Sequence, residues 1–308
     1  MANAFQIIIA VAAVGILSVN AGEHRRLVLA DESRATLHYY DSENPEACFS
    51  IPAEKPLWDL TPVGEQKYRF VVRSGYMVAD LRQRKIVETY RNPALEGVTS
   101  FCNYRNGEHI ASINPGGELR NKAVLVKHFS PNRELTATYI FRGILYCRTM
   151  KYWAERDEIL IAHERGFARC RIPKDLAAGT APDALQEGEL LSNIEILTGR
   201  NSFEAVPDRA GKGYWESTGY GTQLAHLTLD DKVISLWRAD QSGKKNHFYA
   251  QTAEMPNGDI YVANWNGHGV KDSYKGWQVI EFDRDGKVIW HLDDPDKYGS
   301  ISGICVIE

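Results

Sequence analysis

The last eleven residues, Tyr298–Glu308 (YGSISGICVIE), decide the fold. They form an apolar, β-branched run with no turn or partner strand after it. Just before them, Phe248–Asp294 alternates apolar and polar residues around turn pairs such as Asn257-Gly258 and Asp285-Gly286. This pattern is typical of a four-stranded antiparallel meander. The tail therefore predicts the first strand of another sheet whose remaining three strands lie elsewhere.

Those three strands are predicted at the other end of the chain, over Arg26–Asp31, Leu37–Asp41 and Ala47–Pro52. Between the two ends, the first strands of further units begin near residues 58, 98, 145, 201 and 249, at intervals of 40 to 56 residues up to 301. Four strands repeated at this period indicate a β-propeller. Joining the C-terminal strand to the N-terminal three closes the ring and leaves no open edge. We therefore expect an all-β, single-domain, six-bladed propeller over residues 22–308, rather than paired sandwiches or a β-helix.

The first 21 residues have a different character. Ile7–Leu17 is an uncharged apolar run that is short for a membrane span, and small residues at Val19 and Ala21 suit cleavage after Ala21. We expect a signal peptide over residues 1–21, a periplasmic or secreted protein, and no transmembrane segment after cleavage. Because no Lys or Arg precedes the run, an uncleaved anchor helix or a core helix is the alternative.

Composition excludes one class of partner and leaves cysteine chemistry open. The net charge is −4 and no basic stripe with interleaved aromatic residues occurs, so nucleic acid is not expected as a partner. The five cysteines are far apart and form no C-x-x-C pair. Buried thiols are the expected state, with one disulfide or a reactive thiol as the alternative. We expect a monomer.

The predicted last blade contains the two sequence motifs through which the chain resembles known proteins. D-I-Y-V-A-N (residues 259–264) followed by W-Q-V-I-E-F-D-R-D-G-K-V-I-W (residues 277–290) is similar to blades of exported bacterial propellers with PQQ-like, NHL or arylsulfotransferase-like repeats. The resemblance implies the fold and an exported protein. The matching motifs form a structural hairpin. No catalytic residue and no cofactor of these families is therefore assigned to this chain.

Candidate ligand-binding residues are expected where the loops of one propeller face meet at the channel mouth. These loops, and the strand ends beside them, contain aromatic, amide, imidazole and guanidinium side chains. This mixture suits a sugar or an aromatic ligand, because the rings supply flat apolar area and the amides and guanidinium fix hydroxyls or an anionic group. The candidates are Trp58, Asp59, Arg148, His163, His247, Tyr249, Gln251, Asn264, Trp265 and His268. The loop 264–276 (NWNGHGVKDSYKG) is the best single stretch, because loops of this length in a compact domain are often functional.

The sequence is consistent with two kinds of metal site and with one anion site. His163, His247 and His268 are possible ligands of zinc, copper or iron. A divalent cation such as calcium is the other possibility, on the oxygen donors Asp59, Asn114, Asn201 and Asn264. Arg148, placed on a predicted inner strand Leu145–Trp153, needs an anion or an acidic neighbour, because a buried guanidinium requires a partner.

Three functions are consistent with these observations. The first is a binding protein for a small polar ligand, saccharide-like or anionic. The second is a metal-assisted hydrolase, lactonase or lyase at the same mouth, and the third is a protein-interaction scaffold. We expect alanine at Asn264, His268, His247 or Arg148 to impair binding or turnover while the melting temperature stays nearly unchanged.

Overall fold

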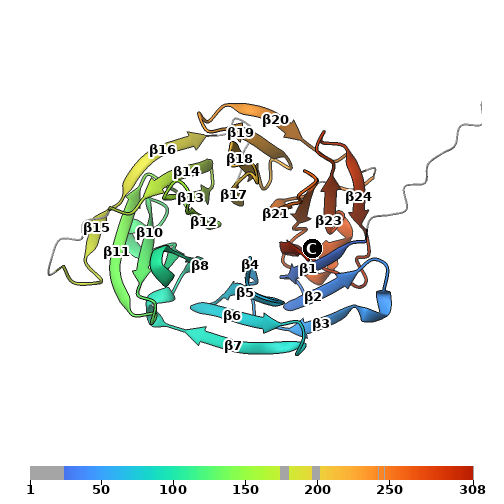
Figure 1. Ribbon diagram of the computed structural model, residues 1–308, viewed down its shortest axis with the longest axis horizontal. Coiled ribbons are helices and arrows are strands. Elements are labelled where there is room, and N and C mark those ends of the chain that lie inside the picture. Colours follow the sequence, from blue (N-terminus) through green and yellow to red (C-terminus); the bar gives the residue numbers. More distant parts are fainter. Residues whose placement is uncertain (1–23, 174–179, 196–201, 242, 246, 308) are drawn as a thin grey trace, which may run out of the picture.

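The computed structural model describes residues 24–173, 180–195, 202–241, 243–245 and 247–307. Six β-sheets stand around a central axis, and the innermost strand of each sheet lies nearest that axis (Figure 1). The predicted six-bladed propeller is therefore confirmed. The predicted signal peptide, residues 1–21, lies outside the described residues. Among the residues described, no helix is long and apolar enough to cross a membrane.

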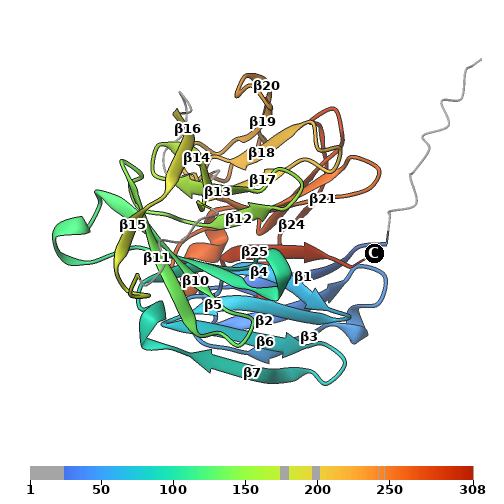
Figure 2. The ribbon, with the colours of Figure 1, turned by 60° about the vertical axis from the view of Figure 1, so that its left-hand side comes forward.

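Blade 1 joins the two ends of the chain, as the tail predicted. Its strands run from the axis outward in the order β25 (Ile301–Val306), β1 (Arg26–Asp31), β2 (Thr36–Asp41) and β3 (Phe49–Pro52). β25 pairs antiparallel with β1, with Leu27 opposite Val306 and Leu29 opposite Ile304. Figure 2 shows β25 lying beside β1.

The other five blades follow in chain order. Blade 2 contains β4 (Trp58–Gly64), β5 (Lys67–Val72), β6 (Gly75–Asp80) and β7 (Lys85–Arg91). Blade 3 contains β8 (Val98–Asn103), β9 (His109–Ile113), β10 (Ala123–Phe129), β11 (Leu135–Arg142) and the added strand β15 (Leu185–Glu187). Blade 4 contains β12 (Met150–Trp153), β13 (Glu158–His163), β14 (Gly166–Arg171) and β16 (Glu189–Glu195).

Blade 5 contains β17 (Glu204–Pro207), β18 (Gly213–Ser217), β19 (Leu224–Thr228) and β20 (Val233–Trp237). Blade 6 contains β21 (Tyr249–Glu254), β22 (Ile260–Asn264), β23 (Val279–Phe282) and β24 (Val288–Leu292). Short 3₁₀ turns occupy loops at Pro45–Ala47, Pro93–Leu95, Arg105–Gly107, Gly117–Leu119 and Val270–Lys275.

The hydrophobic core lies between neighbouring blades. Each pair of adjacent blades shares an apolar cluster, including the pair formed by blades 6 and 1. Between blades 2 and 3, for example, Tyr76 packs against Phe101 and Phe101 against Phe129. A middle strand such as β6 is consequently buried along its whole length, whereas the outer strand β7 alternates exposed and half-buried residues. This ring order places blades 1 and 4 on opposite sides of the axis.

After β14 the chain provides two further strands. The second, β16, is the outer strand of blade 4, and the first, β15, was not predicted. It adds a fifth strand to blade 3, parallel to β11. Gly188 joins the two strands over the ring of Phe141, where a Cβ atom would lie 2.2 Å from the ring. Only glycine lets the chain cross from blade 3 to blade 4 at this point.

The expected inner strand Leu145–Trp153 begins five residues later than predicted. β12 starts at Met150, and the preceding residues form a loop with Tyr146 at a positive φ of 51°. Asn114 holds this loop, because its Oδ1 accepts the amide of Cys147 at 2.8 Å and its Nδ2 donates to the Cys147 carbonyl at 2.9 Å. Arg148 is therefore a rim residue rather than a strand residue.

All five cysteines lie within the described part of the chain, and none forms a disulfide. Cys147, Cys170 and Cys305 are buried, and Cys48 and Cys102 are half-buried. Burial raises the pKa of the Cys147 thiol to about 11 and that of Cys305 to about 12. These thiols therefore stay protonated at neutral pH and behave as small apolar side chains.

Candidate functional site

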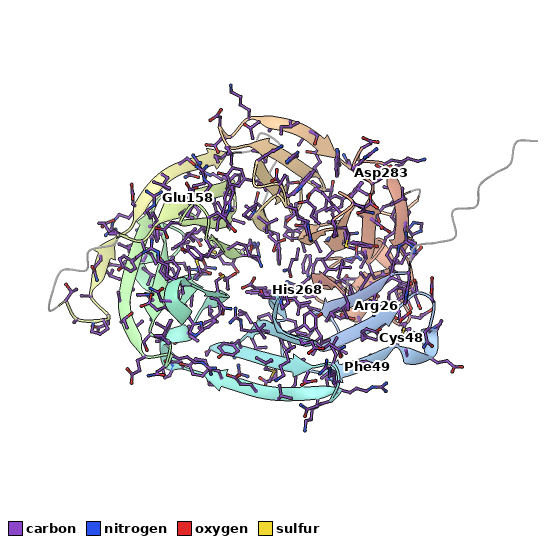
Figure 3. The ribbon with its side chains drawn as sticks, in the orientation of Figure 1. Arg26, Cys48, Phe49, Glu158, His268 and Asp283 are labelled. Atoms are coloured by element: carbon purple, nitrogen blue, oxygen red, sulfur yellow. The ribbon has the colours of Figure 1, made fainter. Side chains whose placement is uncertain are left out.

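A pocket lies at the mouth of the channel, on the face where the predicted rim loops meet. Its cavity volume is about 90 Å³, within about 510 Å³ of empty space that includes open solvent. Five of the six blades contribute to its lining, which consists of Glu32, Trp58, Arg148, Phe203, Tyr220, Phe248, Trp265 and His268. Figure 3 shows His268 at the centre of the ring. The sequence identified four of these residues: Trp58, Arg148, Trp265 and His268.

Glu32 fixes one side of the pocket from the turn between β1 and β2. Its amide donates to the carbonyl of Ser300 at 3.0 Å, and its carboxylate is almost fully buried. The indole Nε1–H of Trp265 donates to Glu32 Oε2 at 2.5 Å, and His268 Nδ1 lies 2.9 Å from Oε1. A buried carboxylate with two such partners holds both rings in place, because charge-assisted hydrogen bonds are short and directional.

Aromatic rings of blades 5 and 6 form the wall next to Glu32. The ring of Phe248 makes edge contacts with Phe203 at 5.7 Å, Tyr220 at 4.8 Å and Trp265 at 5.5 Å between centroids. Phe248 and Phe203 are buried, whereas Tyr220 is 46% exposed. The wall thus presents its outer rings to solvent while its inner rings support them.

Arg148 occupies the opposite side of the pocket. Its guanidinium lies 4.6 Å from the centre of the Tyr146 ring, within the range of a cation–π contact. Within the described residues its side chain makes no ion pair, and its Nε is buried without a hydrogen-bond partner. The expected anionic neighbour of Arg148 is therefore not supplied by the described protein residues.

The loop 264–276 places two of the pocket residues, and its asparagines hold it in shape. Asn264 is fully buried; its Oδ1 accepts the amide of Phe248 at 3.2 Å and its Nδ2 donates to the carbonyl of Trp277 at 2.8 Å. Asn266 donates to the same carbonyl at 3.2 Å. Gly276 passes so close that a Cβ atom there would lie 2.5 Å from Asn266 Oδ1. Asn264 thus shapes the loop and does not line the pocket.

His247 lies behind the pocket wall. Its ring contacts Trp265 at 5.9 Å and Tyr220 at 6.2 Å between centroids, and its Nδ1 is buried without a hydrogen-bond partner. Burial, together with the nearby charge of Lys275, lowers the pKa of His247. The imidazole is therefore neutral at physiological pH and acts as packing for the aromatic wall.

Three other predicted residues are structural. Tyr249 is fully buried and its hydroxyl accepts the amide of Ala239 at 2.9 Å. Gln251 bridges blade 6 to blade 2, because its side chain donates to the carbonyl of Leu60 at 2.6 Å and accepts its amide at 3.1 Å. His163 is buried in blade 4, with Nε2 2.9 Å from Asn193 Oδ1.

Asp59 belongs to a buried charge cluster in the channel, below the pocket. Its Oδ1 lies 2.6 Å from Lys151 Nζ, which is also 3.1 Å from Glu204 Oε1. Burial alone would lower the pKa of Lys151, but Asp59 and Glu204 outweigh it and raise the pKa. Burial raises the pKa of Glu204, against the effect of Lys151. Lys151 is therefore a fixed cation that links three inner strands.

The described residues do not gather into either predicted metal site. They contain no cluster of three or more His, Cys, Asp or Glu side chains able to hold an ion. Among the calcium candidates, Asp59 pairs with Lys151, Asn114 holds the Cys147 backbone and Asn264 holds its own loop. Asn201 lies outside the described residues. These side chains are engaged in separate structural contacts.

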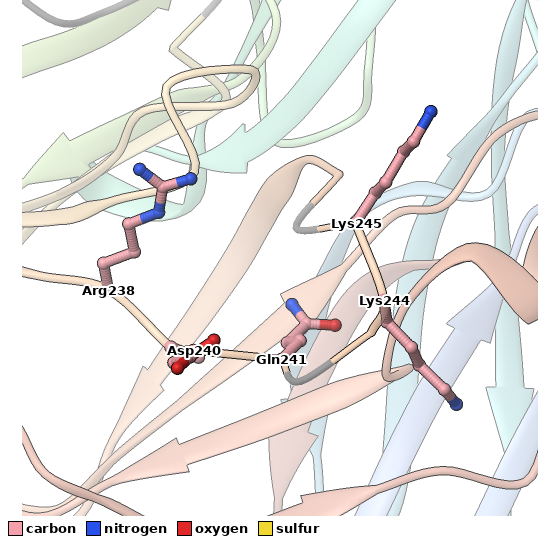
Figure 4. Close-up of a pocket in the computed structure, with 6 residues that line it drawn as sticks. Arg238, Asp240, Gln241, Lys244 and Lys245 are labelled. Atoms are coloured by element: carbon pink, nitrogen blue, oxygen red, sulfur yellow. The ribbon is translucent and has the colours of Figure 1, made fainter.

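A second hollow lies on the loop between β20 and β21 (Figure 4). Its charged and amide lining consists of Arg238, Asp240, Gln241, Lys244 and Lys245. Lys244 pairs with Asp293, and Gln241 Oε1 accepts the amide of Trp277 at 2.8 Å. This hollow is polar and mixed in charge, without an aromatic surface, so it does not match the predicted ring-binding site.

Sequence reasoning missed four lining residues: Glu32, Phe203, Tyr220 and Phe248. Glu32 and Tyr220 stand in the short connections between the second and third strands of blades 1 and 5, on the face where the rim loops meet. The signal for both was therefore present, but a lone glutamate or tyrosine in a short turn does not stand out. Phe203 and Phe248 precede inner strands and read as ordinary core residues, because their apolar character fits either role.

The comparisons with known proteins identify the fold. No protein-family model and no curated protein matches this chain. A solved protein of unknown function from Bacteroides caccae is similar, with 21% identity, a TM-score of 0.66, and coverage of 92% of this chain and 99% of that one. Streptogramin B lyase matches at 11% identity and a TM-score of 0.54, covering 87% and 79% of the two chains. A chain of a nidogen/laminin complex matches at 10% identity and a TM-score of 0.58, covering 91% and 97%. At these identities the likeness is one of fold alone.

Proposed function

We propose that this protein binds a small, ring-containing molecule in the pocket at its channel mouth. The observation that carries the proposal is the aromatic wall, whose outermost rings face an open space while Glu32 fixes Trp265 from behind. Sugar rings and aromatic rings both have flat apolar faces that pack well on such side chains. A wall held rigid before binding loses little conformational entropy when the ligand arrives.

The apolar contact sets the scale of the expected affinity. Burial of roughly 100 Å² of ligand surface contributes about 2.5 kcal/mol. That alone gives a dissociation constant in the range of tens of millimolar, so polar contacts have to supply the remainder. Two polar groups of the pocket are available for them: Arg148 and the exposed face of His268.

Isothermal titration calorimetry with a panel of monosaccharides and simple aromatic compounds tests the proposal. We expect binding by at least one ring compound, and loss of about tenfold or more in affinity when Trp265→Ala removes the ring of the wall that Glu32 holds. Trp265→Phe keeps a ring at this position and should retain most of the affinity. Trp290→Phe, on the outer strand β24, is the control. A panel without any binder, or equal binding by Trp265→Ala, overturns the proposal.

A second candidate function is general acid–base catalysis at the same pocket. His268 Nδ1 is held by Glu32, and the side chain is 76% exposed, so its Nε2 is accessible to a bound molecule. A carboxylate that orients an imidazole in this way is a common arrangement for proton transfer. Incubation of each binder with the protein, followed by mass spectrometry, distinguishes the two functions: turnover that His268→Ala abolishes supports an enzyme, and recovery of unchanged ligand supports a binding protein.

We propose further that the protein is exported to the periplasm or the medium after cleavage of residues 1–21. The sequence of this segment supports export, and the likeness of the last blade to exported propellers agrees with it. A monomeric propeller that presents one open mouth outside the cytoplasm suits capture of a small extracellular molecule.

A further inference from the structure

We propose that the ligand is a ring-bearing monocarboxylate, such as a sugar acid or an aromatic acid, and that Arg148 binds its carboxylate. This inference rests on the proposed function and deepens it, because it assigns the chemical class of the molecule in the mouth pocket. The argument depends on the state of Arg148, on the position of Glu32, and on the distance between the two around the ring.

The positive charge of Arg148 has no acidic partner among the described residues of the pocket. Arg25, between blades 6 and 1, provides a contrast, because it donates to the Glu281 carboxylate at 2.5 Å. In the described part of the chain, the side chain of Arg148 has neither an ion pair nor a hydrogen bond, and its Nε is shielded from solvent. The Arg148 side chain as a whole is only half-buried, so a ligand carboxylate at the mouth could provide the anionic partner that the described residues do not supply. The ring of Tyr146 already holds the guanidinium, so binding does not have to order it.

Glu32 does not neutralise Arg148, because its oxygens are engaged elsewhere. One oxygen accepts the Trp265 indole N–H and the other faces His268. Glu32 comes from blade 1 and Arg148 precedes the inner strand of blade 4, three places away in a ring of six. The negative group and the positive group therefore approach the pocket from opposite sides.

This separation of charges determines the orientation of the bound ligand. A carboxylate is attracted to Arg148 and repelled by Glu32, while the ring lies along the aromatic wall of blades 5 and 6. A hydroxyl at the other end of the ring would meet His268, whose side chain is 76% exposed. A phosphate would bring a second charge with no second cation in the pocket lining, so a monoanion is the better match.

Matched pairs of probes test this inference by titration calorimetry: glucuronate against glucose, and 4-hydroxybenzoate against 4-hydroxybenzyl alcohol. For at least one pair we expect the acid to bind about tenfold or more tightly than its neutral partner, in line with a charge-assisted contact. In Arg148→Gln the ratio should fall towards one, because the acid loses its charge-assisted contact and therefore far more affinity than its neutral partner. Arg284→Gln, an exposed arginine in the β23–β24 turn, is the matched control.

The outcomes separate the inference from the proposed function. Equal binding of acid and neutral partner by the native protein, or an acid preference that survives in Arg148→Gln, overturns the inference while ring binding stands. Failure of every probe, neutral or acidic, in a screen that includes the wider panel overturns the proposed function itself. Preference within the sugar pair or within the aromatic pair identifies which source of carboxylate the pocket accepts. The melting temperature of Arg148→Gln, expected to be unchanged, verifies folding.

Discussion

Lys151 and Asp59 form an ion pair inside the channel, with Nζ 2.6 Å from Oδ1, and it joins the inner strand of blade 4 to that of blade 2. Asp59 Oδ2 also accepts the amide of Phe101 at 3.1 Å, which draws blade 3 into the same contact. Glu204 of blade 5 completes the cluster and accepts the amide of Thr252 in blade 6 at 2.7 Å. Five of the six blades are thus connected through three charged side chains.

Removal of the cation should destabilise the ring. Lys151→Met leaves two buried carboxylates without their partner, so we expect a loss of about 3–5 kcal/mol in the free energy of unfolding, measured by urea denaturation. Lys85→Met, at an exposed position of β7, should change it by less than about 0.5 kcal/mol. Adding Asp59→Asn to Lys151→Met should restore part of the loss. A Lys151→Met variant as stable as the native protein would show that the cluster has no structural role.

A buried carboxyl in blade 5 should make stability depend on pH. Glu216 is fully buried; Ser202 Oγ donates to its Oε1, and its Oε2 has no partner among the described residues. Burial raises the pKa of Glu216 to about 8, from an ordinary value of 4.5. The folded state therefore binds the proton more tightly than the unfolded state. The contribution of Glu216 to stability is complete below pH 4.5 and is lost as the pH rises towards about 8.

Glu216→Gln removes this titration while it keeps the acceptor for Ser202. We expect the variant to be more stable than the native protein at pH 8.5, by on the order of 2–4 kcal/mol, and similar to it at pH 4.5. Thermal unfolding across this pH range provides the measurement. The exposed Glu134→Gln should follow the native curve throughout. Parallel curves for Glu216→Gln and the native protein would contradict the assignment.

Alanine substitutions at Asn264 and at His268 should differ in their effect on stability, although the sequence analysis expected neither to change the melting temperature. Asn264→Ala removes two buried hydrogen bonds and leaves the amide of Phe248 unsatisfied, so a loss of about 2–4 kcal/mol in stability is expected. His268→Ala alters a side chain that is 76% exposed and should change stability by less than about 0.5 kcal/mol. Differential scanning calorimetry measures the stability of both variants. An unchanged melting temperature for Asn264→Ala would contradict this prediction and agree with the expectation from the sequence.

This difference shows what the sequence can predict here. The fold followed from period, turn pairs and the split blade, because each depends on local pattern and on the requirement that sheet edges be paired. The pocket was predicted only in part. Trp58, Arg148, Trp265 and His268 were found from their place in loops. Tyr249, Gln251 and Asn264 are not among the residues that line this pocket, since a strand end carries the same residue types whether the side chain meets a ligand or a neighbouring blade.

Strand β25, which closes the ring, should be destabilised by a side chain at Gly303. A Cβ atom there would lie 2.8 Å from Leu60 Cβ and 2.9 Å from Gln251 Oε1, so Gly303→Val has to displace the contact between blades 1, 2 and 6. We expect a loss of about 1–3 kcal/mol, measured by urea denaturation. Gly116→Ala, where a Cβ meets nothing within 4 Å, is the control and should be near neutral. Equal stability of Gly303→Val and the native protein would contradict tight closure.

The proposed export makes a simple prediction about mass. Expression in a bacterial host with an intact secretion pathway should yield a periplasmic protein that begins at Gly22, 21 residues shorter than the encoded chain. Intact-mass spectrometry and N-terminal sequencing measure this. Substitution of Ala21 by a large residue should slow the cleavage. Recovery of the full-length chain from the cytoplasm would argue against a signal peptide.

The closure of blade 1 also determines when the molecule can finish folding. Asp31 pairs with Ile301, so strands made at the start of translation wait for the last segment to be synthesised. Bringing together two segments so far apart in the chain is intrinsically slow. Until then β1 has an open edge and the apolar face of blade 6 that β25 covers is exposed, so a nascent or truncated chain is prone to aggregate there. Under the proposed export, the same delay would keep the chain unfolded during its passage through a narrow secretion channel.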